Sequence, residues 1–441
     1  MELYKQGEHY TLYNGSMLEL NNVIADNSID SIVCDPPYEL GFMGKSWDSS
    51  GIAFNPNTWK TCYNALKSGG YLLAFGGSRT YHRIACAIED AGFEIRDTIM
   101  WIYGSGFPKS MNIGLAVDKK NGVESEIIGS NGTMPDFQDA GKKNSINKIG
   151  INDGDSADRK DCYVYKAQNE WNGWGTTLKP AYEPIIVARK PCEGSTTDNV
   201  IKYGVGGINI DECRVPISGS DVEMINAKSS KNPTDNYNNN EAKKYGDYAL
   251  NVATPANQLG RFPSNVILTY DETDEEEVCG GFPQTVSSGG SGVASKKNTF
   301  ANTYNGGWGH DLDCAHLGGL GDSGSASRYF YCAKASKRDR DEGLVVTKIK
   351  NIHPTVKPTD LMQYLVRLVT PKGGTVLDPF NGSGSTGKAV LYENLDRDKD
   401  YKYIGIELER EYCDISSARL DYVEELLKQP KQLSLFDTLT T

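Results

Sequence analysis

The sequence predicts an α/β fold with a doubly wound sheet, in a domain that is written as two separated pieces. Short apolar strands alternate with amphipathic helices over about the first hundred residues, and the same alternation returns after about residue 355. A long middle segment rich in Gly, Ser, Asn and Asp separates the two pieces. Because 441 residues are many for one compact domain, we expect the middle to form a second module.

The first piece begins with a buried strand at Ile29–Cys34, a short and mostly apolar run that ends at two prolines. A helix follows, with Asn57 as its expected N-cap. Its apolar face is formed by side chains at helical spacing: Trp59, Cys62, Tyr63 and Leu66. We expect this helix to end at Gly69-Gly70, before a strand at Tyr71–Phe75. Another helix, outlined by Ile84, Ala85 and Ile88, and a strand at Ile99–Tyr103 complete the piece.

The second piece repeats this pattern. Its first helix has Thr359 as a candidate N-cap, and its apolar stripe consists of Leu361, Tyr364, Leu365 and Leu368. Gly373-Gly374 ends this helix, and a strand at Thr375–Leu377 follows. A glycine-rich segment then leads into a helix from about Ser385, and the last strand spans Tyr403–Ile406.

These boundaries divide the chain into four segments. Residues 1–190 and 331–427 are expected to form the two halves of the α/β domain, residues 191–330 the irregular insert, and residues 428–441 a flexible tail.

Charge and cysteine content limit the possible classes of protein. A net charge of −12 argues against binding nucleic acid over the whole surface, but a local basic cleft stays open because basic residues cluster, as at Lys334–Arg340. No run approaches 18 apolar residues and no apolar signal core follows Met1, so we expect a cytoplasmic protein without a membrane segment. The ten cysteines form no CxxC pair, and four candidate ligands match no common zinc spacing, so we expect no metal site; these are Cys279, His310, Cys314 and His316.

The first motif with a chemical reading is Asp35-Pro36-Pro37-Tyr38, directly after the strand at Ile29–Cys34. The exocyclic amine of a base is a poor nucleophile, because its lone pair is delocalised into the ring. The Asp35 carboxylate and the Pro36 carbonyl could accept hydrogen bonds from this amine and stabilise the positive charge that develops on methylation. The prolines fix the direction of that carbonyl, and Tyr38 offers a flat surface for an extruded base. The alternative is a structural Pro-Pro turn that ends in a surface tyrosine.

The second motif lies between a strand and a helix and runs Asp378-Pro379-Phe380-Asn381-Gly382-Ser383-Gly384-Ser385-Thr386. Glycines allow the backbone to approach a ligand, and a helix N-terminus attracts the ligand's negative end. Glu407, at the end of the next strand, could bind ribose hydroxyls. The segment matches neither the GxxxxGK[ST] nor the GxGxxG pattern, and alone it could also belong to a nucleotide-dependent enzyme.

Together these motifs resemble the beta group of the DNA amino-methyltransferases, in which the catalytic motif precedes the cofactor motif. Asp35–Tyr38 resembles their DPPY, and Phe380–Gly384 resembles their FxGxG. His353–Pro358 is similar to their segment for the methionine end of the cofactor, which points to Thr355 and to a salt bridge from Lys357. Lys179–Pro184 resembles the beginning of a strand in such enzymes.

The resemblance implies a Rossmann-like methyltransferase domain that binds S-adenosylmethionine, with the insert at 191–330 as the target-recognition region. It implies that the protein flips a base out of double-stranded DNA as part of a restriction-modification system. The insert and Lys334–Arg340 would contact the DNA phosphates. A DPPY motif favours the N6 amine of adenine, and the N4 amine of cytosine is the alternative. RNA or protein targets are disfavoured by the large insert, and an inert DNA-binding module by the intact Asp35 and glycine loop.

Two further expectations concern partners. Gln432-Leu433-Ser434-Leu435-Phe436 in the tail resembles the peptide by which bacterial DNA-working proteins dock onto the sliding clamp. The alternative is a frayed helix end whose apolar residues fold back onto the body. The family also suggests a homodimer, for which the sequence shows no signal.

Overall fold

The structure is a computed structural model of the whole chain. It describes residues 1–41, 46–103, 110–133, 161–217, 222–223, 259–271, 284–286, 323–325, 330–335, 338–344 and 349–429. These residues divide into two compact units, of which one comprises Met1–Ile102 and Glu183–Thr441 and the other Tyr103–Tyr182. Among the described residues, no helix is both long and apolar enough to cross a bilayer.

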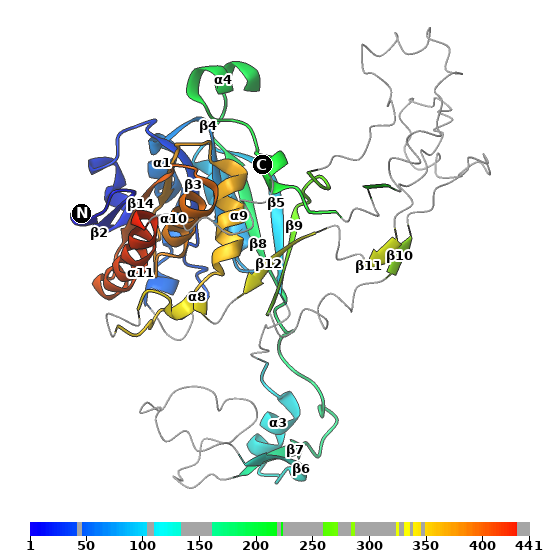
Figure 1. Cartoon of the computed structure of the whole chain (residues 1–441). Helices are drawn as coiled ribbons and strands as arrows, with labels where there is room; N and C mark the ends of the chain where they lie inside the picture. The colour runs from blue at the N-terminus through cyan, green and yellow to red at the C-terminus, as the bar shows by residue number, and fades with distance from the viewer. Residues whose placement is uncertain are drawn as a thin grey trace, which may run out of the picture. The chain divides into compact units, whose positions relative to one another are not determined.

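The large unit is built on a ten-stranded sheet with the order β1-β2-β14-β13-β3-β4-β8-β5-β9-β12 (Figure 1). The central block from β2 to β4 is parallel, whereas β1 and β8 run antiparallel to their neighbours β2 and β4. The strands are β1 (Glu2–Gln6), β2 (Tyr10–Asn14), β3 (Ile29–Cys34), β4 (Leu66–Phe75), β5 (Glu94–Tyr103), β8 (Tyr182–Arg189), β9 (Val266–Asp271), β12 (Tyr331–Ala335), β13 (Thr375–Asp378) and β14 (Lys402–Glu407). The predicted α/β fold with one sheet assembled from both pieces of the chain is therefore confirmed.

Helices connect these strands. They are α1 (Pro56–Ala65), α2 (Tyr81–Asp90), α4 (Thr196–Tyr203), α8 (Arg338–Asp341), α9 (Thr359–Val369), α10 (Ser385–Arg397) and α11 (Arg410–Lys428), with short 3₁₀ turns η1 (Met17–Asn22), η3 (Ser46–Ser49), η4 (Ile52–Phe54) and η5 (Asp211–Cys213). The helix α9 packs against α10 and against strands β3, β4 and β12. Sandwiched in this way, it is buried from Thr359 to Val369 except at Asp360.

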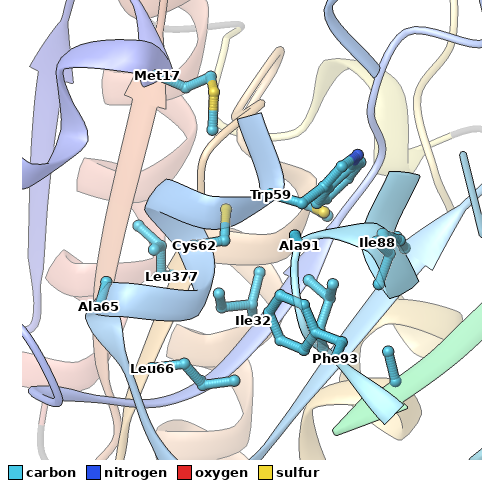
Figure 2. Packing of buried hydrophobic residues seen from close by; sticks show 14 of the residues in the cluster. Met17, Ile32, Trp59, Cys62, Ala65, Leu66, Ile88, Ala91, Phe93 and Leu377 are labelled. Atoms are coloured by element: carbon cyan, nitrogen blue, oxygen red, sulfur yellow. The ribbon is translucent and has the colours of Figure 1, made fainter. Parts of the chain in front are cut away.

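The main apolar core joins the two predicted pieces. Ile32 on β3 and Leu377 on β13 are fully buried in one cluster with Trp59 and Cys62 of α1 and Ile88 of α2 (Figure 2). Burying side chains of this size is worth roughly 1.5–3 kcal/mol each. The core therefore fixes β3 against β13, although more than 300 residues of sequence separate them.

The predicted end of α1 was wrong. The helix stops at Ala65 and not at Gly69-Gly70, because Leu66 is fully buried and extended and already belongs to β4. The two glycines instead make an irregularity inside β4, where Leu66 pairs with Ile29 but Tyr71 pairs with Ser31. Gly69 has a φ of +80° and would place a Cβ atom 2.1 Å from the Asn199 amide nitrogen, so only glycine fits there.

Two predicted N-caps were also wrong. The side chain of Asn55, and not that of Asn57, accepts the hydrogen bond that caps α1, and Pro56 occupies the first helical position. Helix α9 begins with Pro358 as its N-cap, because the hydroxyl of Thr359 donates to Asp339 Oδ1 at 2.6 Å instead of capping.

The segment predicted as the insert also contributes to the sheet. Strand β9 lies within residues 191–330, neighbours β5 in the sheet and pairs in parallel with β12. The described part of the segment also contains α4, η5 and a short antiparallel pair, β10 (Gln284–Val286) and β11 (Ser323–Ser325).

The small unit, residues 103–182, was not predicted as a separate body. It contains α3 (Ile113–Asn121) and the antiparallel strands β6 (Glu126–Thr133) and β7 (Asp161–Lys166). Asp118 of α3 is buried and accepts hydrogen bonds from the backbone of Gln168 and the side chains of Asn169 and Ser125. These bonds lower the pKa of Asp118.

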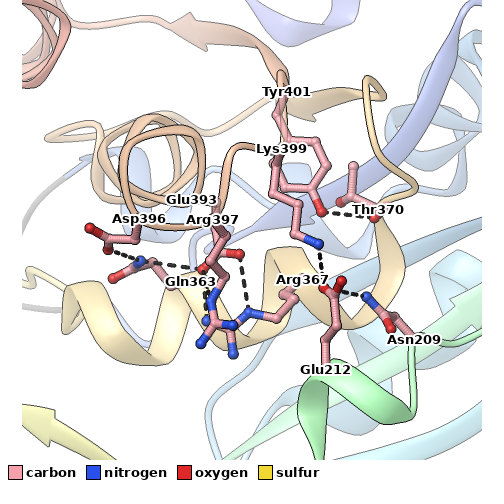
Figure 3. A network of polar contacts seen from close by, with 10 residues as sticks. All are labelled: Asn209, Glu212, Gln363, Arg367, Thr370, Glu393, Asp396, Arg397, Lys399 and Tyr401. Atoms are coloured by element: carbon pink, nitrogen blue, oxygen red, sulfur yellow. Dashed lines mark hydrogen bonds and ion pairs between the residues drawn. The ribbon is translucent and has the colours of Figure 1, made fainter. Parts of the chain in front are cut away.

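A buried ion pair links α9 to α10 (Figure 3). The guanidinium of Arg367 donates to both carboxylate oxygens of Glu393, at 2.7 and 3.1 Å, and the Glu393 side chain is fully buried. Gln363 donates to the same carboxylate at 3.3 Å. Two parallel hydrogen bonds of this kind hold both groups in a fixed geometry.

We predict that Glu393→Ala lowers the free energy of unfolding by about 3–5 kcal/mol, because it leaves the Arg367 charge buried without its main partner. Urea denaturation at neutral pH measures this loss. Glu193→Ala is the matched control, because Glu193 is exposed and pairs with Lys202 on the surface. Equal stabilities of the two variants would contradict a structural role for the buried pair.

Candidate functional site

The two predicted motifs meet at one edge of the sheet. β3 and β13 are parallel neighbours, with Leu377 opposite Ile32, so their carboxyl ends lie side by side. Asp35 follows the end of β3, and Asp378 is the last residue of β13. From here the chain passes through α1 to β4 on one side and through α10 to β14 on the other. This reversal is the position at which open α/β sheets bind ligands.

Asp35 is the centre of a compact polar cluster. Its Oδ2 accepts a hydrogen bond from Lys357 Nζ at 2.6 Å, and its Oδ1 accepts one from the Tyr38 hydroxyl at 2.9 Å. Glu183, in β8, is the second carboxylate: its Oε2 lies 2.7 Å from the Tyr38 hydroxyl and 3.5 Å from Lys357 Nζ. The Asp35 side chain keeps 21% of its surface exposed, so it can still be reached from outside.

Lys357 is buried, with 7% of its side chain exposed, among aromatic rings. Its Nζ lies 5.0 Å from the ring centre of Phe75, 5.5 Å from that of Tyr38 and 5.9 Å from that of Trp101. Burial alone would lower the pKa of Lys357, but the charges of Asp35 and Glu183 outweigh it and raise the pKa above its usual value. Lys357 is therefore a cation at neutral pH, held by carboxylates and by ring faces.

Tyr38 is neutral in this environment. Burial, followed by the charges of Asp35 and Glu183, raises the pKa of its hydroxyl well above the usual value. Pro36 is buried and Pro37 half-buried next to it. The predicted stacking of a base on Tyr38 stays a prediction.

The glycine-rich loop after β13 is held by its own acidic residue. Asp378 is buried, and its carboxylate accepts hydrogen bonds from the Thr386 hydroxyl at 2.6 Å and from the Phe380 amide at 3.0 Å. Burial raises the pKa of Asp378 to about 7. Phe380 is half-buried, and its ring packs at 6.0 Å from that of Trp59 in α1.

Two polar side chains of this loop face the protein. Asn381 accepts hydrogen bonds from the hydroxyls of Tyr403, at 2.8 Å, and Ser416, at 3.3 Å. The carbonyl and hydroxyl of Ser383 accept hydrogen bonds from Arg419. These contacts fix the shape of the loop.

Gly382 and Gly384 both require the left-handed backbone region, with φ of +52° and +76°. A Cβ atom on Gly382 would lie 2.9 Å from His353 Nε2, and one on Gly384 would lie 2.5 Å from Ser416 Oγ. His353 therefore covers the loop closely. Burial lowers the pKa of His353 to about 4, so its ring is neutral at pH 7.

Glu407 ends β14 beside the same loop. Its Oε2 accepts a hydrogen bond from the Gly382 amide at 2.6 Å, and its Oε1 accepts one from the Glu409 amide at 2.8 Å. Burial raises the pKa of Glu407 to about 7. A carboxylate has further lone pairs, so these two bonds leave it able to accept from a ligand hydroxyl.

Thr355 and Lys357 differ in position. The side chain of Thr355 is exposed, and its carbonyl lies 2.7 Å from His353 Nδ1, which places it next to the glycine loop. Lys357 contacts Asp35 and Glu183, so the predicted salt bridge to a cofactor carboxylate would require Nζ to leave Asp35. Cys279, His310, Cys314, His316 and the tail peptide Gln432–Phe436 lie outside the described residues.

Glu183, His353 and Arg419 had no predicted role. The run Lys179–Pro184 resembled a strand beginning and contained Glu183, which was the available signal. Nothing local indicated Arg419, which is fully buried and connects Ser383 to the Asp339 carbonyl.

We predict that Glu407→Gln flattens the pH dependence of stability in the ligand-free protein. The folded state has a Glu407 pKa of about 7, whereas an unfolded glutamate titrates near ~4.3. The folded state thus holds the proton more tightly. The contribution of Glu407 to the free energy of unfolding is fully present below the unfolded pKa, and up to about 4 kcal/mol is lost as pH rises through the folded pKa. Urea denaturation from about pH 5 to pH 8 measures the slope. Part of the slope should persist through Asp378, and an unchanged slope in the variant would show that Glu407 does not cause it.

Comparisons with known proteins agree with this arrangement. The model of the DNA methylase family for N6 and N4 enzymes matches residues 29–418. Type II methyltransferase M2.MboI of Moraxella bovis is 41% identical over 81 residues, which cover 18% of this chain and 28% of that protein. Type II methyltransferase M2.DpnII of Streptococcus pneumoniae is 40% identical over 80 residues, with the same shares. The matched stretch thus spans less than a third of these relatives.

Among solved structures, the PvuII DNA methyltransferase, described as cytosine-N4-specific, is 13% identical with a TM-score of 0.41, over 98% of this chain and 92% of that one. At this level the structural likeness adds no argument. The family model, in contrast, spans both motifs and the sheet between them. On that basis, the chain belongs to the DNA methylase family.

Proposed function

We propose that this protein transfers a methyl group from S-adenosylmethionine to the N6 amine of a flipped-out adenine in double-stranded DNA. The observation that carries the proposal is the position of the Asp35 carboxylate and of the glycine loop at the carboxyl ends of two neighbouring parallel strands. A methyl donor bound at the loop and an amine bound at the carboxylate would then face each other, separated by about the distance between two neighbouring strands.

The chemistry on the DNA side belongs to Asp35 and Pro36. Their oxygens accept hydrogen bonds from the target NH₂, which directs its lone pair toward the methyl group and stabilises the positive charge that forms on nitrogen. Tyr38 offers its ring to the extruded base, which offsets part of the few kcal/mol that flipping costs. Much of the acceleration comes from holding the two reactants in line.

The residues around the loop fit S-adenosylmethionine. When bound, this cofactor supplies an activated sulfonium methyl. Glu407 would accept from the ribose hydroxyls, as acidic residues at this position of the fold do. The backbone of Gly382, Ser383 and Gly384, at the start of α10, would lie against the methionine moiety, with Thr355 beside it. Asp378, Phe380, Asn381 and Thr386 would act by holding the loop in its shape.

The choice of adenine rests on the DPPY motif alone. The amine of cytosine can make the same hydrogen bonds, and the matching family model covers both N6 and N4 enzymes. N4-cytosine methylation is therefore the second candidate. An inert DNA-binding module is disfavoured, because Asp35 keeps a partly exposed carboxylate beside an intact glycine loop.

Further proposals concern the rest of the chain. We propose that residues 191–330 form the target-recognition region and that Gln432–Phe436 bind the sliding clamp. We also propose that the protein acts in the cytoplasm, in a restriction-modification system like those of the type II relatives. A homodimer is expected from the family alone. Among the basic residues at 334–340, Arg340 donates to the carbonyls of Asn351 and His353. Arg340 therefore holds the backbone beside the site, so contacts with DNA phosphates would come from the other basic residues at 334–340.

We predict that Asp35→Ala abolishes methyl transfer, by at least about 100-fold, and leaves binding of S-adenosylmethionine intact. Asp35 contacts the amine in the proposed mechanism, and the cofactor lies on the other strand end. Transfer of tritiated methyl groups to DNA and calorimetric titration with the cofactor measure the two properties. Retained turnover would reject the role of Asp35.

Gly382→Val is the matched contrast. A side chain at a φ of +52° and 2.9 Å from His353 must distort the loop, so this variant should lose cofactor binding before any transfer step. Normal cofactor affinity in Gly382→Val would remove the loop from the proposal.

We predict that DNA from cells expressing the protein carries N6-methyladenine within one short sequence context. Sequencing that detects modified bases identifies base and context together. N4-methylcytosine would establish the second candidate, and DNA without either modification would contradict the proposed function. Cells that express Asp35→Ala provide the unmodified reference.

A further inference from the structure

A positive charge already occupies the hydrogen-bonding position that the mechanism assigns to the target amine. Lys357 Nζ lies 2.6 Å from Asp35 Oδ2, which is the distance of a strong charged hydrogen bond. While Nζ stays there, an incoming NH₂ group would have to share this oxygen with the ammonium. An ammonium beside a nitrogen that is acquiring positive charge would also oppose the reaction.

Glu183 offers a second acceptor to the same ammonium. Its Oε2 lies 3.5 Å from Nζ, and the Tyr38 hydroxyl lies within hydrogen-bonding distance of both carboxylates, at 2.9 Å from Asp35 and 2.7 Å from Glu183. The rings of Phe75 and Trp101 face Nζ as well. Nζ can therefore exchange one carboxylate for the other over a short path without entering water.

We propose that Glu183 is a positioning residue that receives the Lys357 ammonium when the target amine takes its place on Asp35. This inference rests on the proposed function, because it assigns Asp35 to the target amine. Before DNA binds, Lys357 keeps the carboxylate of Asp35 paired. After base flipping, Glu183 holds the displaced charge away from the reacting nitrogen.

A merely structural ion pair and the proposed exchange differ in their response to pH. In the wild type both carboxylates raise the pKa of Lys357 against the effect of burial. Tyr38 and His353 stay neutral from pH 7 to pH 9, since burial lowers the pKa of His353 to about 4 and raises that of Tyr38 well above its usual value. Asp378, with a pKa of about 7, interacts with Asp35 and is present in the wild type and in every variant. Removing the Glu183 charge should lower the pKa of Lys357, and deprotonation would then free Asp35.

The decisive variant is Glu183→Gln, which keeps the shape of the side chain and removes its charge. We predict that it slows single-turnover methyl transfer about 10- to 100-fold at pH 7, with cofactor affinity unchanged within about twofold. Its rate should rise by up to about tenfold per pH unit toward pH 9, while the wild-type rate changes little. The assay uses tritiated S-adenosylmethionine and unmethylated amplified genomic DNA, at saturating concentrations of both.

Two variants serve as controls. Glu183→Asp keeps the charge and should transfer within about fivefold of the wild type, without the added pH dependence. Glu193→Gln removes an exposed carboxylate that pairs with Lys202, and it should behave as the wild type.

The outcomes separate the two proposals. A wild-type protein that transfers no methyl group to DNA overturns the proposed function and this inference with it. An active wild type with equal rates for Glu183→Gln, or with a slowed variant whose rate does not recover with pH, overturns only the inference.

A double variant covers the case in which Glu183→Gln does not fold. Glu183→Gln with Lys357→Met removes the whole charge pair, which proteins often tolerate better than a single unpaired charge. It should bind the cofactor and transfer methyl groups without the added pH dependence, because no ammonium competes for Asp35. Loss of cofactor binding or loss of transfer in the double variant would overturn the inference.

Discussion

The pairing of β3 with β13 is the contact on which the rest of the molecule depends. It places two chain segments more than 300 residues apart in register, Leu377 opposite Ile32, with both side chains fully buried. Parallel neighbours end at the same edge, so the residues after them must face a common space. Because β3 is buried along its whole length, a slip of one residue would turn each of its side chains into the packing on the opposite face of the sheet. The packing of the apolar core therefore determines where the two motifs lie relative to each other.

Buried charges then fix the glycine loop within that frame. Arg419 is fully buried and donates to the Ser383 carbonyl, the Ser383 hydroxyl and the Asp339 carbonyl. Lys388, also buried, pairs with Glu342 at 2.7 Å. Together these contacts connect α11 and α10 to residues 339–342. Within this segment, Arg340 donates a hydrogen bond to the His353 carbonyl. Hydrogen bonds with charged groups are directional and strong, so they set the loop more narrowly than apolar packing alone would.

The sequence predicted correctly those elements whose position depends on interactions between residues close in sequence. The strand Ile29–Cys34 and the start of α10 at Ser385 agree with the structure, because short apolar runs and a glycine-rich turn before a helix carry their own signal. Gly69-Gly70 predicted a helix end because glycine often ends helices. The burial of Leu66, which pairs with Ile29, starts the strand earlier and places both glycines inside β4. The contacts of Lys357 with Asp35 and Glu183 could not be predicted, since three distant segments supply them.

In the proposed mechanism, the charges around Asp35 suit methyl transfer better than they suit the resting state. Asp35, Glu183 and Lys357 together carry a net charge of minus one, and Tyr38 and His353 add none at neutral pH, because their pKa values are shifted away from it. A neutral base amine entering the cluster leaves this charge unbalanced. During methyl transfer the positive charge would move from the sulfonium of the cofactor to the nitrogen held by Asp35, where it would lie closer to the carboxylates and balance their charge. Electrostatic stabilisation therefore grows as the reaction proceeds, which is the condition for lowering the barrier and not merely binding the substrate.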